Sequence, residues 1–422
     1  MPRKILWLVS KVLPQVGKAL GLPAENEGGW IVGQLGQLKH RAEITVCTVC
    51  ARAGENARCT LDGADYVVLP RGEAADFARL LDEVKPDLVH LWGSEYPPAM
   101  ALQTEAEAAG VPVLLSVQGL MGPCAEHLLD GVPEQYCGSC FVQRCIDRVV
   151  PGELLDKKLA YFKRQAQVEK AMLARQRHVT GRTQWDREQL AVLAPKAAYY
   201  PCGETLRPTF YGPEWNPEAQ DPEAPVLFLS QGNYPLKGLH RLLKALPKVL
   251  ARYPKAKLVI AGWPPLERGA LLRPVIDWMF PYQNYTKTLI RQLGLQGAVH
   301  YTGPLNEQAI CEQYLHSSLY VLCSSMENSP NSLGEAMLLG MPCVASDVGG
   351  VSSLLTHERE GLLYPAEDEN ALAEAILALL DDPARARRLG KAAQARARVT
   401  HDPEKNAADM LTIYRQAAGG KV

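Results

Sequence analysis

Two glutamates with seven residues between them mark the stretch of this chain best suited to chemistry. Glu327 lies in a polar loop after the apolar run 319–323, which is typical of a buried strand. Glu335 lies in a helical pattern that opens near Leu333 and stops at Gly340. A strand, a polar loop and a helix N-terminus hold anions, because backbone N–H groups and the positive end of the helix dipole face the loop. The stretch therefore predicts an anion site flanked by two carboxylates.

Both glutamates also have ordinary interpretations. Ser332-x-x-Glu335 has the spacing of a capping box, in which the serine caps the helix and the glutamate bonds back to the cap. That spacing by itself favours capping. For Glu327 the ordinary interpretation is a solvated carboxylate in a surface loop.

Further polar residues follow predicted strands in both halves of the chain. Lys237 ends a loop before a helix, where a lysine is usually solvated but can also meet an anion. Gly29 follows the first predicted strand, where paired glycines let a backbone approach a ligand. Gln118, His90 and Glu95 lie near other strand ends. His90 is more typical of a hydrogen-bonded strand histidine than of a catalyst.

The composition is that of an ordinary globular protein with two or three domains. The chain has 422 residues, of which 47% are apolar and 22% charged. Its 45 basic and 46 acidic side chains nearly cancel, so the overall charge points neither to nucleic acid nor to a membrane surface. The N-terminal apolar run is too short for a signal peptide, and no stretch approaches the ~18 apolar residues of a spanning helix. Eleven cysteines scattered through apolar runs suggest a reducing compartment, so we expect a cytoplasmic protein.

Buried runs alternate with helical patterns along both halves, which predicts parallel, doubly wound sheets. Strands are expected in the first half at 4–10, 44–49, 66–69, 88–91, 113–117, 178–181 and 197–200. Strands are expected in the second half at 226–229, 257–261, 298–301, 319–323, 342–345 and 361–364. The proline-rich stretch 203–225 between the halves has the composition of a hinge.

The motifs of the second half resemble a known family. Glu327-x7-Glu335, followed by Ala336-Met-Leu-Leu-Gly-Met-Pro342 and Ala345-Ser-Asp-Val-Gly-Gly350, is similar to the retaining glycosyltransferases of family 4, which have the GT-B fold. The resemblance covers 226–398 and is thinner before it. It implies an α/β protein of two Rossmann-like domains that face each other across a cleft. It implies these parts: an acceptor domain at 1–205, a linker at 206–225, a nucleotide-sugar donor domain at 226–400, and a helix at about 402–418 that packs back on the first domain.

The resemblance also implies a role for each candidate residue. Glu335 accepts hydrogen bonds from the ribose hydroxyls of the donor. Glu327 and Lys237 are the catalytic residues: Glu327 lies beside the donor sugar and supports positive charge at the anomeric carbon, and Lys237 offsets charge on the departing diphosphate. The other donor-binding residues that it implies are Gly29, Gln118, Gln231, Asn328, Ser329, Asn331 and Ser332.

The chain departs from the family at three places. Asn328-Ser329-Pro330 stands where the family usually has Gly-Phe-Gly, so the sugar is not identified. Gln118 occupies the place of a histidine and cannot take up a proton. An arginine that the family carries is absent near Gln231; Arg182 either replaces it or forms a surface ion pair.

We therefore predict a metal-independent glycosyltransferase of the hexosyltransferase type that needs no cofactor and acts with retention. The donor is a nucleotide-diphosphate sugar, with a UDP-sugar favoured, and the acceptor is a saccharide, lipid-linked or small-molecule hydroxyl. Such an enzyme would serve polysaccharide, glycolipid or other glycoconjugate biosynthesis. The competing classes are a nucleotide-sugar 2-epimerase-like isomerase and a non-catalytic nucleotide-sugar-binding protein.

Two features of the first half have two interpretations each. Cys124, Cys137, Cys140 and Cys145 form either a tetrahedral zinc site or a set of free thiols in an acceptor loop. The basic helical pattern at 153–177 either touches anionic lipid at the inner face of the membrane or is a solvated face over an ordinary apolar stripe.

Overall fold

The computed structural model describes residues 4–22, 29–148, 152–266 and 273–419 of the chain. These residues form two compact units. The first unit comprises residues 1–121, 165–208 and 399–422, and the second comprises 122–164 and 209–398. Each unit is described below by itself.

The first unit is built on a sheet of eight strands in the order β3-β4-β2-β1-β5-β6-β7-β8. Its strands are β1 Lys4–Val9, β2 Glu43–Val49, β3 Ala57–Leu61, β4 Ala64–Leu69, β5 Leu88–Trp92, β6 Val113–Ser116, β7 His178–Gly181 and β8 Ala198–Pro201. Neighbouring strands are parallel except β3 and β4. The predicted parallel sheet is confirmed, with the antiparallel hairpin strand β3 as an addition. Its residues alternate between half-buried and exposed positions, so it lacks the continuous apolar run that revealed the other strands.

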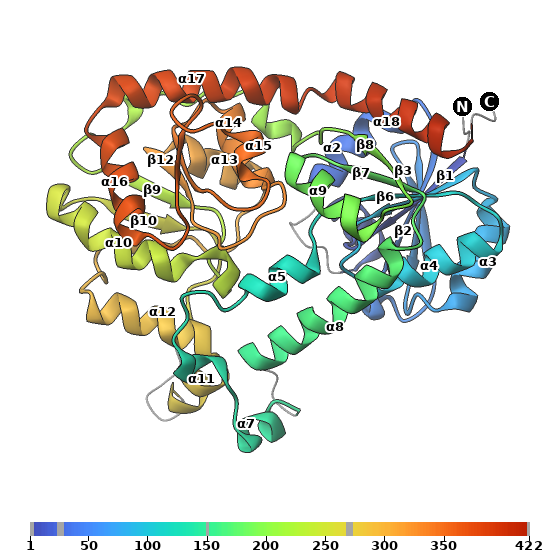
Figure 1. Cartoon of the computed structure of the whole chain (residues 1–422), viewed down its shortest axis with the longest axis horizontal. Helices are drawn as coiled ribbons and strands as arrows, with labels where there is room; N and C mark the ends of the chain where they lie inside the picture. Colours follow the sequence, from blue (N-terminus) through green and yellow to red (C-terminus); the bar gives the residue numbers. More distant parts are fainter. Residues whose placement is uncertain (1–3, 23–28, 149–151, 267–272, 420–422) are drawn as a thin grey trace. The chain divides into compact units, whose positions relative to one another are not determined.

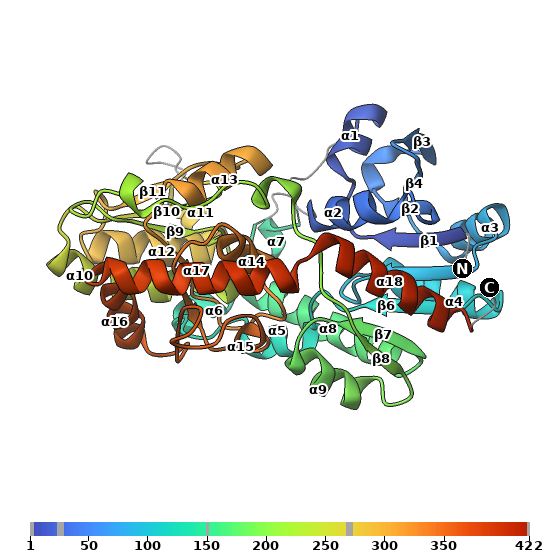
Figure 2. The same ribbon diagram turned by 90° about the horizontal axis from the view of Figure 1, so that it is seen from above.

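Helices cover both faces of this sheet, and β1 shows why. Ile5, Trp7 and Val9 face one apolar core, whereas Leu6 and Leu8 face another. A strand buried on both faces is apolar at every position, because successive side chains point to opposite faces. The helices of this unit are α1 Pro14–Leu20, α2 Gly29–Leu38, α3 Ala74–Val84, α4 Pro97–Ala108, α9 Gln184–Leu193 and α18 Pro403–Ala417, with the short η1 Ala51–Ala53. Helices α3 and α4 pack side by side (Figure 1; Figure 2).

The C-terminal helix α18 supplies a polar anchor to the first unit. Tyr414 is fully buried, and its hydroxyl accepts from Trp7 Nε1 at 3.0 Å and meets His90 Nδ1 at 2.8 Å. The other ring nitrogen of His90 lies 2.7 Å from Ser116 Oγ. The prediction of a hydrogen-bonded strand histidine is therefore confirmed. Burial holds the pKa of His90 well below its ordinary value, so the ring is neutral.

The second unit contains a six-stranded parallel sheet in the order β11-β10-β9-β12-β13-β14. Its strands are β9 Val226–Leu229, β10 Lys257–Ile260, β11 Val299–Tyr301, β12 Leu319–Leu322, β13 Cys343–Ser346 and β14 Leu362–Tyr364. Its helices after the β9 strand are α10 Leu239–Arg252, α11 Arg273–Met279, α12 Pro281–Gln292, α13 Glu307–Leu315, α14 Asn331–Leu338, α15 Val351–Leu354, α16 Glu369–Leu380 and α17 Pro383–Thr400, with the short η4 Pro235–Lys237. The stretch before β9 holds η2 Pro208–Phe210 and η3 Pro217–Ala219. Helix α10 packs against both α12 and α16.

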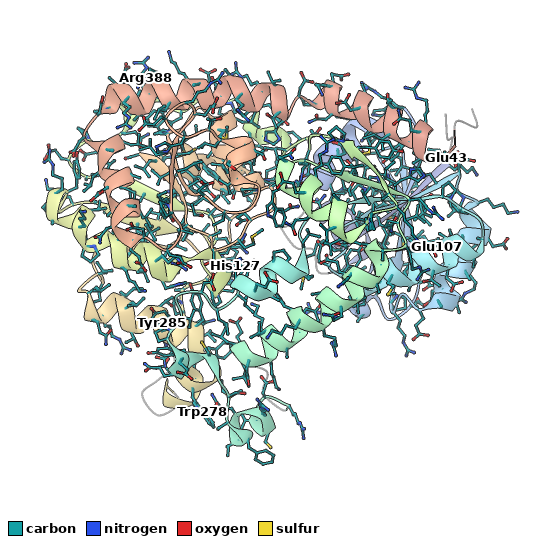
Figure 3. The ribbon with its side chains drawn as sticks, viewed as in Figure 1. Glu43, Glu107, His127, Trp278, Tyr285 and Arg388 are labelled. Carbon is teal, nitrogen blue, oxygen red and sulfur yellow. The ribbon has the colours of Figure 1, made fainter. Side chains whose placement is uncertain are left out.

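Residues 122–164 precede β7 in the chain but pack within the second unit. They carry most of α5 Met121–His127, then α6 Glu134–Cys137, α7 Phe141–Ile146 and the start of α8 Leu155–Leu173. Gln143 Nε2 donates to the carbonyl of Trp278 at 2.8 Å, and the rings of Tyr136 and Tyr285 lie 5.0 Å apart. Figure 3 labels Trp278 and Tyr285 on the second unit's α11 and α12. Backbone and ring contacts thus attach this segment to the helices α11 and α12.

We expect His240 to make the second unit sensitive to acid. Burial, helped by the positive charges of Arg241 and Lys244, lowers the pKa of His240 to about 3. Between pH 6.5 and 3 the imidazole of His240 is protonated in the unfolded chain but neutral in the folded chain. The contribution of His240 to the free energy of unfolding is therefore fully present above pH 6.5 and is lost as the pH falls. The loss should approach about 1.4 kcal/mol per pH unit from this residue. Urea unfolding at about pH 7.5 and 5.5, on either side of the ordinary histidine pKa, measures it.

The matched comparison uses His240→Gln and His300→Gln. His300 is exposed on β11, whereas His240 is buried between Tyr282 and the Asp130 carbonyl. His240→Gln should reduce the loss of stability between the two pH values, and His300→Gln should leave it unchanged. Equal losses in wild type and His240→Gln would contradict the assignment.

Candidate active site

The candidate functional side chains of the second unit lie where its parallel strands end. Lys237 follows β9 through the short η4, and Glu327 follows β12. The helix α14 begins four residues after Glu327, at Asn331. The carboxyl ends of parallel strands meet at one edge of a sheet, which is where ligands bind in open α/β folds.

Lys237 and Glu327 form an ion pair at this edge. Lys237 Nζ lies 2.6 Å from Glu327 Oε1, and Ser324 Oγ donates to the same oxygen at 2.6 Å. The two side chains are only 19% and 10% exposed, so water screens the pair weakly. Burial acts to lower the pKa of Lys237, but the charge and hydrogen bond of Glu327, together with the nearby tyrosines, raise it above its ordinary value. Lys237 is therefore cationic at neutral pH.

Close backbone contacts fix both members of this pair. Gly238 has φ +70°, and a Cβ there would lie 1.7 Å from the Cys323 carbonyl oxygen. Gly349 has φ +50°, and a Cβ there would lie 2.0 Å from the Glu327 carbonyl oxygen, which also accepts from Gly350 N at 3.1 Å. Only glycine allows such approaches. The sequence motif at 345–350 includes Gly349. Only the structure shows that this glycine positions the backbone of Glu327.

The start of α14 excludes the capping-box interpretation. The N-cap residue is Pro330, without a side-chain cap bond, and Ser332 lies inside the helix. Ser332 Oγ instead accepts from the hydroxyl of Tyr320 at 2.8 Å, and that hydroxyl also lies 3.1 Å from Ser230 Oγ. Tyr320 was hidden in an apolar strand pattern, and only its contacts connect it to the site.

The remaining predicted donor residues lie on the same loop and helix or in the loop after β9. Glu335 is 4% exposed on α14, and Asn328 and Ser329 are 8% and 7% exposed in the loop before it. Asn331 opens the helix. Gln231 is half-buried in the loop between β9 and η4.

The predicted residues of the first unit form a separate group at the ends of its strands. Gln118 follows β6, and its Nε2 donates to Glu204 Oε1 at 3.3 Å. Arg182 follows β7 and pairs with Glu204, both side chains being under 10% exposed. Gly29 opens α2, where a Cβ would lie 2.4 Å from Arg207 Cδ. Arg182 is therefore held in an internal ion pair; its role as a replacement cation stays a prediction.

Two carboxylates accompany this group. Glu169, on α8, is 2% exposed and accepts from Ser94 Oγ at 2.5 Å and from Met121 N at 2.8 Å. Burial first, and then the charge of Glu169, raises the pKa of Glu95 to about 7. The sequence pattern drew attention to Glu95 only through its place after a strand and gave no signal for Glu169.

The zinc interpretation finds no support in the described part of the chain. No group of three or more histidine, cysteine or acidic residues there could hold a metal ion. Cys124, Cys137, Cys140 and Cys145 are all outside disulfides. Cys137 Sγ donates to the carbonyl of Pro133 at 3.5 Å, as an ordinary helix-end thiol does.

Some of the basic residues in the stretch 153–177 have partners within the protein. Lys157 pairs with Asp147, and Arg175 pairs with Glu107. The ammonium of Lys158 lies 4.5 Å above the ring of Tyr234, a cation–π contact. Among the helices that the structure describes, none is long and apolar enough to span a bilayer.

A cavity of about 450 Å³ lies away from all these residues, in the first unit. Its lining includes Lys4 and Glu43, the residues at which the strands β1 and β2 begin. Its charged lining is paired internally, through Lys4 with Glu43 and Arg58 with Glu83. The cavity takes no part in the site.

Comparison with known proteins identifies the class of the second unit. Residues 213–396 match the family model described as "Glycosyl transferases group 1", so the chain contains a glycosyl transferases group 1 domain. Over 163 residues it is 31% identical to an uncharacterised glycosyltransferase of Methanocaldococcus jannaschii, covering 39% of this chain and 37% of that protein. Over 166 residues it is 30% identical to D-inositol 3-phosphate glycosyltransferase 2 of Catenulispora acidiphila, with coverage of 39% and 37%. The chain thus spans little more than a third of these curated relatives.

Solved structures extend the likeness to the whole fold. Sucrose-phosphate synthase of Thermosynechococcus elongatus matches with a TM-score of 0.73 and 18% identity, over 99% of this chain and 100% of that chain. HepE of Anabaena, in complex with UDP and glucose, matches with a TM-score of 0.64 and 16% identity, over 98% and 100%. The fold is therefore GT-B, with two Rossmann-like parallel-sheet domains, and the predicted fold class is confirmed.

Proposed function

We propose that this protein is a glycosyltransferase that moves a sugar from a nucleotide-diphosphate sugar to a hydroxyl acceptor, with retention of configuration. The observation that carries the proposal is the Lys237–Glu327 ion pair, which lies at the strand ends of a glycosyl transferases group 1 domain. A cation and a carboxylate in contact match the two charges of the reaction. Negative charge develops on the leaving diphosphate, and positive charge develops on the anomeric carbon.

Each residue has a definite part in this proposal. Lys237 contacts the diphosphate, and Glu327 faces the sugar. Glu335 accepts from the ribose hydroxyls, since a carboxylate can take two adjacent hydroxyls. UDP-sugars are favoured because the HepE structures hold UDP, UDP with glucose, and UDP-glucose. Around the sugar and the distal phosphate we place Asn328, Ser329, Asn331 and Ser332.

The bond changes balance without a cofactor. The bond between the anomeric carbon and the phosphate oxygen breaks, and its electron pair stays on the diphosphate. The acceptor oxygen forms the new bond on the same face, and its proton goes to the leaving phosphate. Lys237 and the helix N-termini offset charge on the diphosphate, so the proposal requires no divalent metal.

We expect Glu335→Ala to weaken UDP binding by about 10–100-fold, because hydrogen bonds to a charged acceptor contribute about 1.5–3 kcal/mol. Isothermal titration with UDP measures this. Glu374→Ala is the control, since Glu374 is an exposed partner of Lys248 on α16. Unchanged UDP affinity in Glu335→Ala would remove the ribose role.

The function is tested by a thermal-shift panel of nucleotide sugars followed by product analysis. A bound donor at about 100 times its dissociation constant adds ~2.7 kcal/mol of stability. Free nucleotide together with a new glycoside supports transfer. An altered nucleotide sugar without free nucleotide identifies an isomerase, and binding without turnover across all acceptors identifies a binding protein.

A further inference from the structure

Arg241 is a buried cation that the proposed donor site does not use. It lies in the first turn of α10 and is 3% exposed. Its Nε is completely covered and has no hydrogen-bond partner among the described residues. A buried arginine without an acceptor costs several kcal/mol, so such groups are normally paired.

Carbonyl groups of the loop that covers Arg241 accept hydrogen bonds from other side chains. The loop at Gly131 lies directly over it, since a Cβ there would be 3.5 Å from Arg241 Cζ. The Asp130 carbonyl accepts from His240 at 3.0 Å, and the Gly131 carbonyl accepts from Tyr285 at 3.5 Å. All of these residues belong to the second unit.

One carboxylate, Glu369, acts on the same tyrosines as Arg241 with the opposite sign. Glu369 pairs with Lys244 at 3.1 Å rather than with Arg241. The positive charge of Arg241 instead reaches two neutral groups, Cys323 and Tyr285, and works to lower the pKa of each against the larger effect of burial.

The hydroxyl of Tyr364 is a third neutral group near this charge. Burial raises the pKa of Tyr364 well above its ordinary value, and Arg241 works against that rise. The Tyr364 hydroxyl interacts with the Ser346 side chain, whose own hydroxyl donates to the Ser324 carbonyl at 2.7 Å.

We infer that Arg241 binds a phosphate-type oxyanion beneath the Gly131 loop. A guanidinium can offer two parallel N–H groups to such an oxyanion, and the N-terminus of α10 adds the positive end of a helix dipole. The N-cap of α10 is Gly238, which has no side-chain cap bond. Lys237 is paired with Glu327, so Arg241 is a second and distinct cation. The oxyanion is either free phosphate or the diphosphate of a nucleotide.

The experiment compares thermal unfolding in inorganic phosphate and in chloride at matched ionic strength. We expect phosphate to raise the Tm of the full chain by about 2–4 °C over chloride, which corresponds to partial saturation of one site. Arg241→Met should abolish this shift, and Arg241→Lys should retain only part of it because the fork of donors is lost. Without phosphate, Arg241→Met should be at least as stable as wild type, since a buried charge has been removed.

A matched control assigns the effect to this site. Lys244→Met removes a cation one turn along α10 that is already paired, and it should keep the phosphate shift. A parallel titration with UDP identifies the source. Loss of both shifts in Arg241→Met assigns the oxyanion to the nucleotide, and loss of the phosphate shift only assigns it to free phosphate. A phosphate shift of equal size in Arg241→Met, or none in wild type, overturns the inference.

Discussion

Glu327→Gln is expected to lower kcat for sugar transfer by about 10²–10³-fold, the usual cost of removing one preorganised electrostatic contact. The amide keeps the size of the carboxylate and can still accept from Ser324, so the loop should hold its shape. What disappears is the negative charge that faces the anomeric carbon in the proposed mechanism. Since that charge matters most in the transition state, KM for the donor should change little. Steady-state kinetics with the donor found by thermal shift measures both constants.

The free energy of unfolding of the Glu327→Gln variant distinguishes a catalytic role of Glu327 from a structural one. The substitution leaves Lys237 charged and mostly buried, which should cost about 3 kcal/mol. Adding Lys237→Met removes the unpaired charge and should restore most of that stability without restoring turnover. A double variant that regains activity together with stability would show that the pair only holds the fold. Full activity of Glu327→Gln would also contradict the assignment.

Gly349→Ala is expected to cost at least about 3 kcal/mol of stability and to reduce kcat more than about tenfold, because a special backbone conformation and a close contact are disturbed together. The methyl group would lie 2.0 Å from the Glu327 carbonyl oxygen, in a residue with φ +50°. The backbone must therefore move, and Glu327 moves with it.

The control variant Gly294→Ala separates the effect of the close contact at Gly349 from the effect of a positive φ. Gly294 has φ +68°, but a methyl group there would meet no atom within 4 Å. The substitution should cost only the ~1–2 kcal/mol of a left-handed residue and leave kcat unchanged. Chemical denaturation gives the two stabilities, and kinetics gives the two rates. Equal effects of both substitutions would mean that Gly349 does not position Glu327.

Local patterns were enough to predict the sheet strands other than β3, and the edge of the second sheet at which the candidate site lies. The runs at 226–229 and 319–323 are continuously apolar because their strands are buried on both faces, as β9 and β12 show. Lys237 and Glu327 lie in the loops that follow these two runs, so strand order by itself placed both at one edge. The fold class and the position of the candidate site therefore follow from the sequence pattern.

Patterns could not show which partner each polar group would find. Ser332 had the spacing of an N-cap residue, but the helix begins earlier, after Pro330. The hydroxyl of Ser332 instead accepts a hydrogen bond from Tyr320. Residues 122–164 carry no sign that they pack with α11 and α12, because a loop-rich segment has no periodicity to reveal its partner. The buried state of Arg241 is equally invisible, since a basic residue in a helix is usually solvated.

What the sequence by itself determined is the class of fold and the order of chemical groups along it, because both follow from short-range spacing. What only the tertiary structure decided is contact between residues far apart in the chain. It joined Lys237 to Glu327 across 90 residues, placed Gly349 against the Glu327 carbonyl, and left the Nε of Arg241 buried beneath the Gly131 loop without a hydrogen-bond partner among the described residues. Such contacts depend on packing, which is set by the whole chain at once.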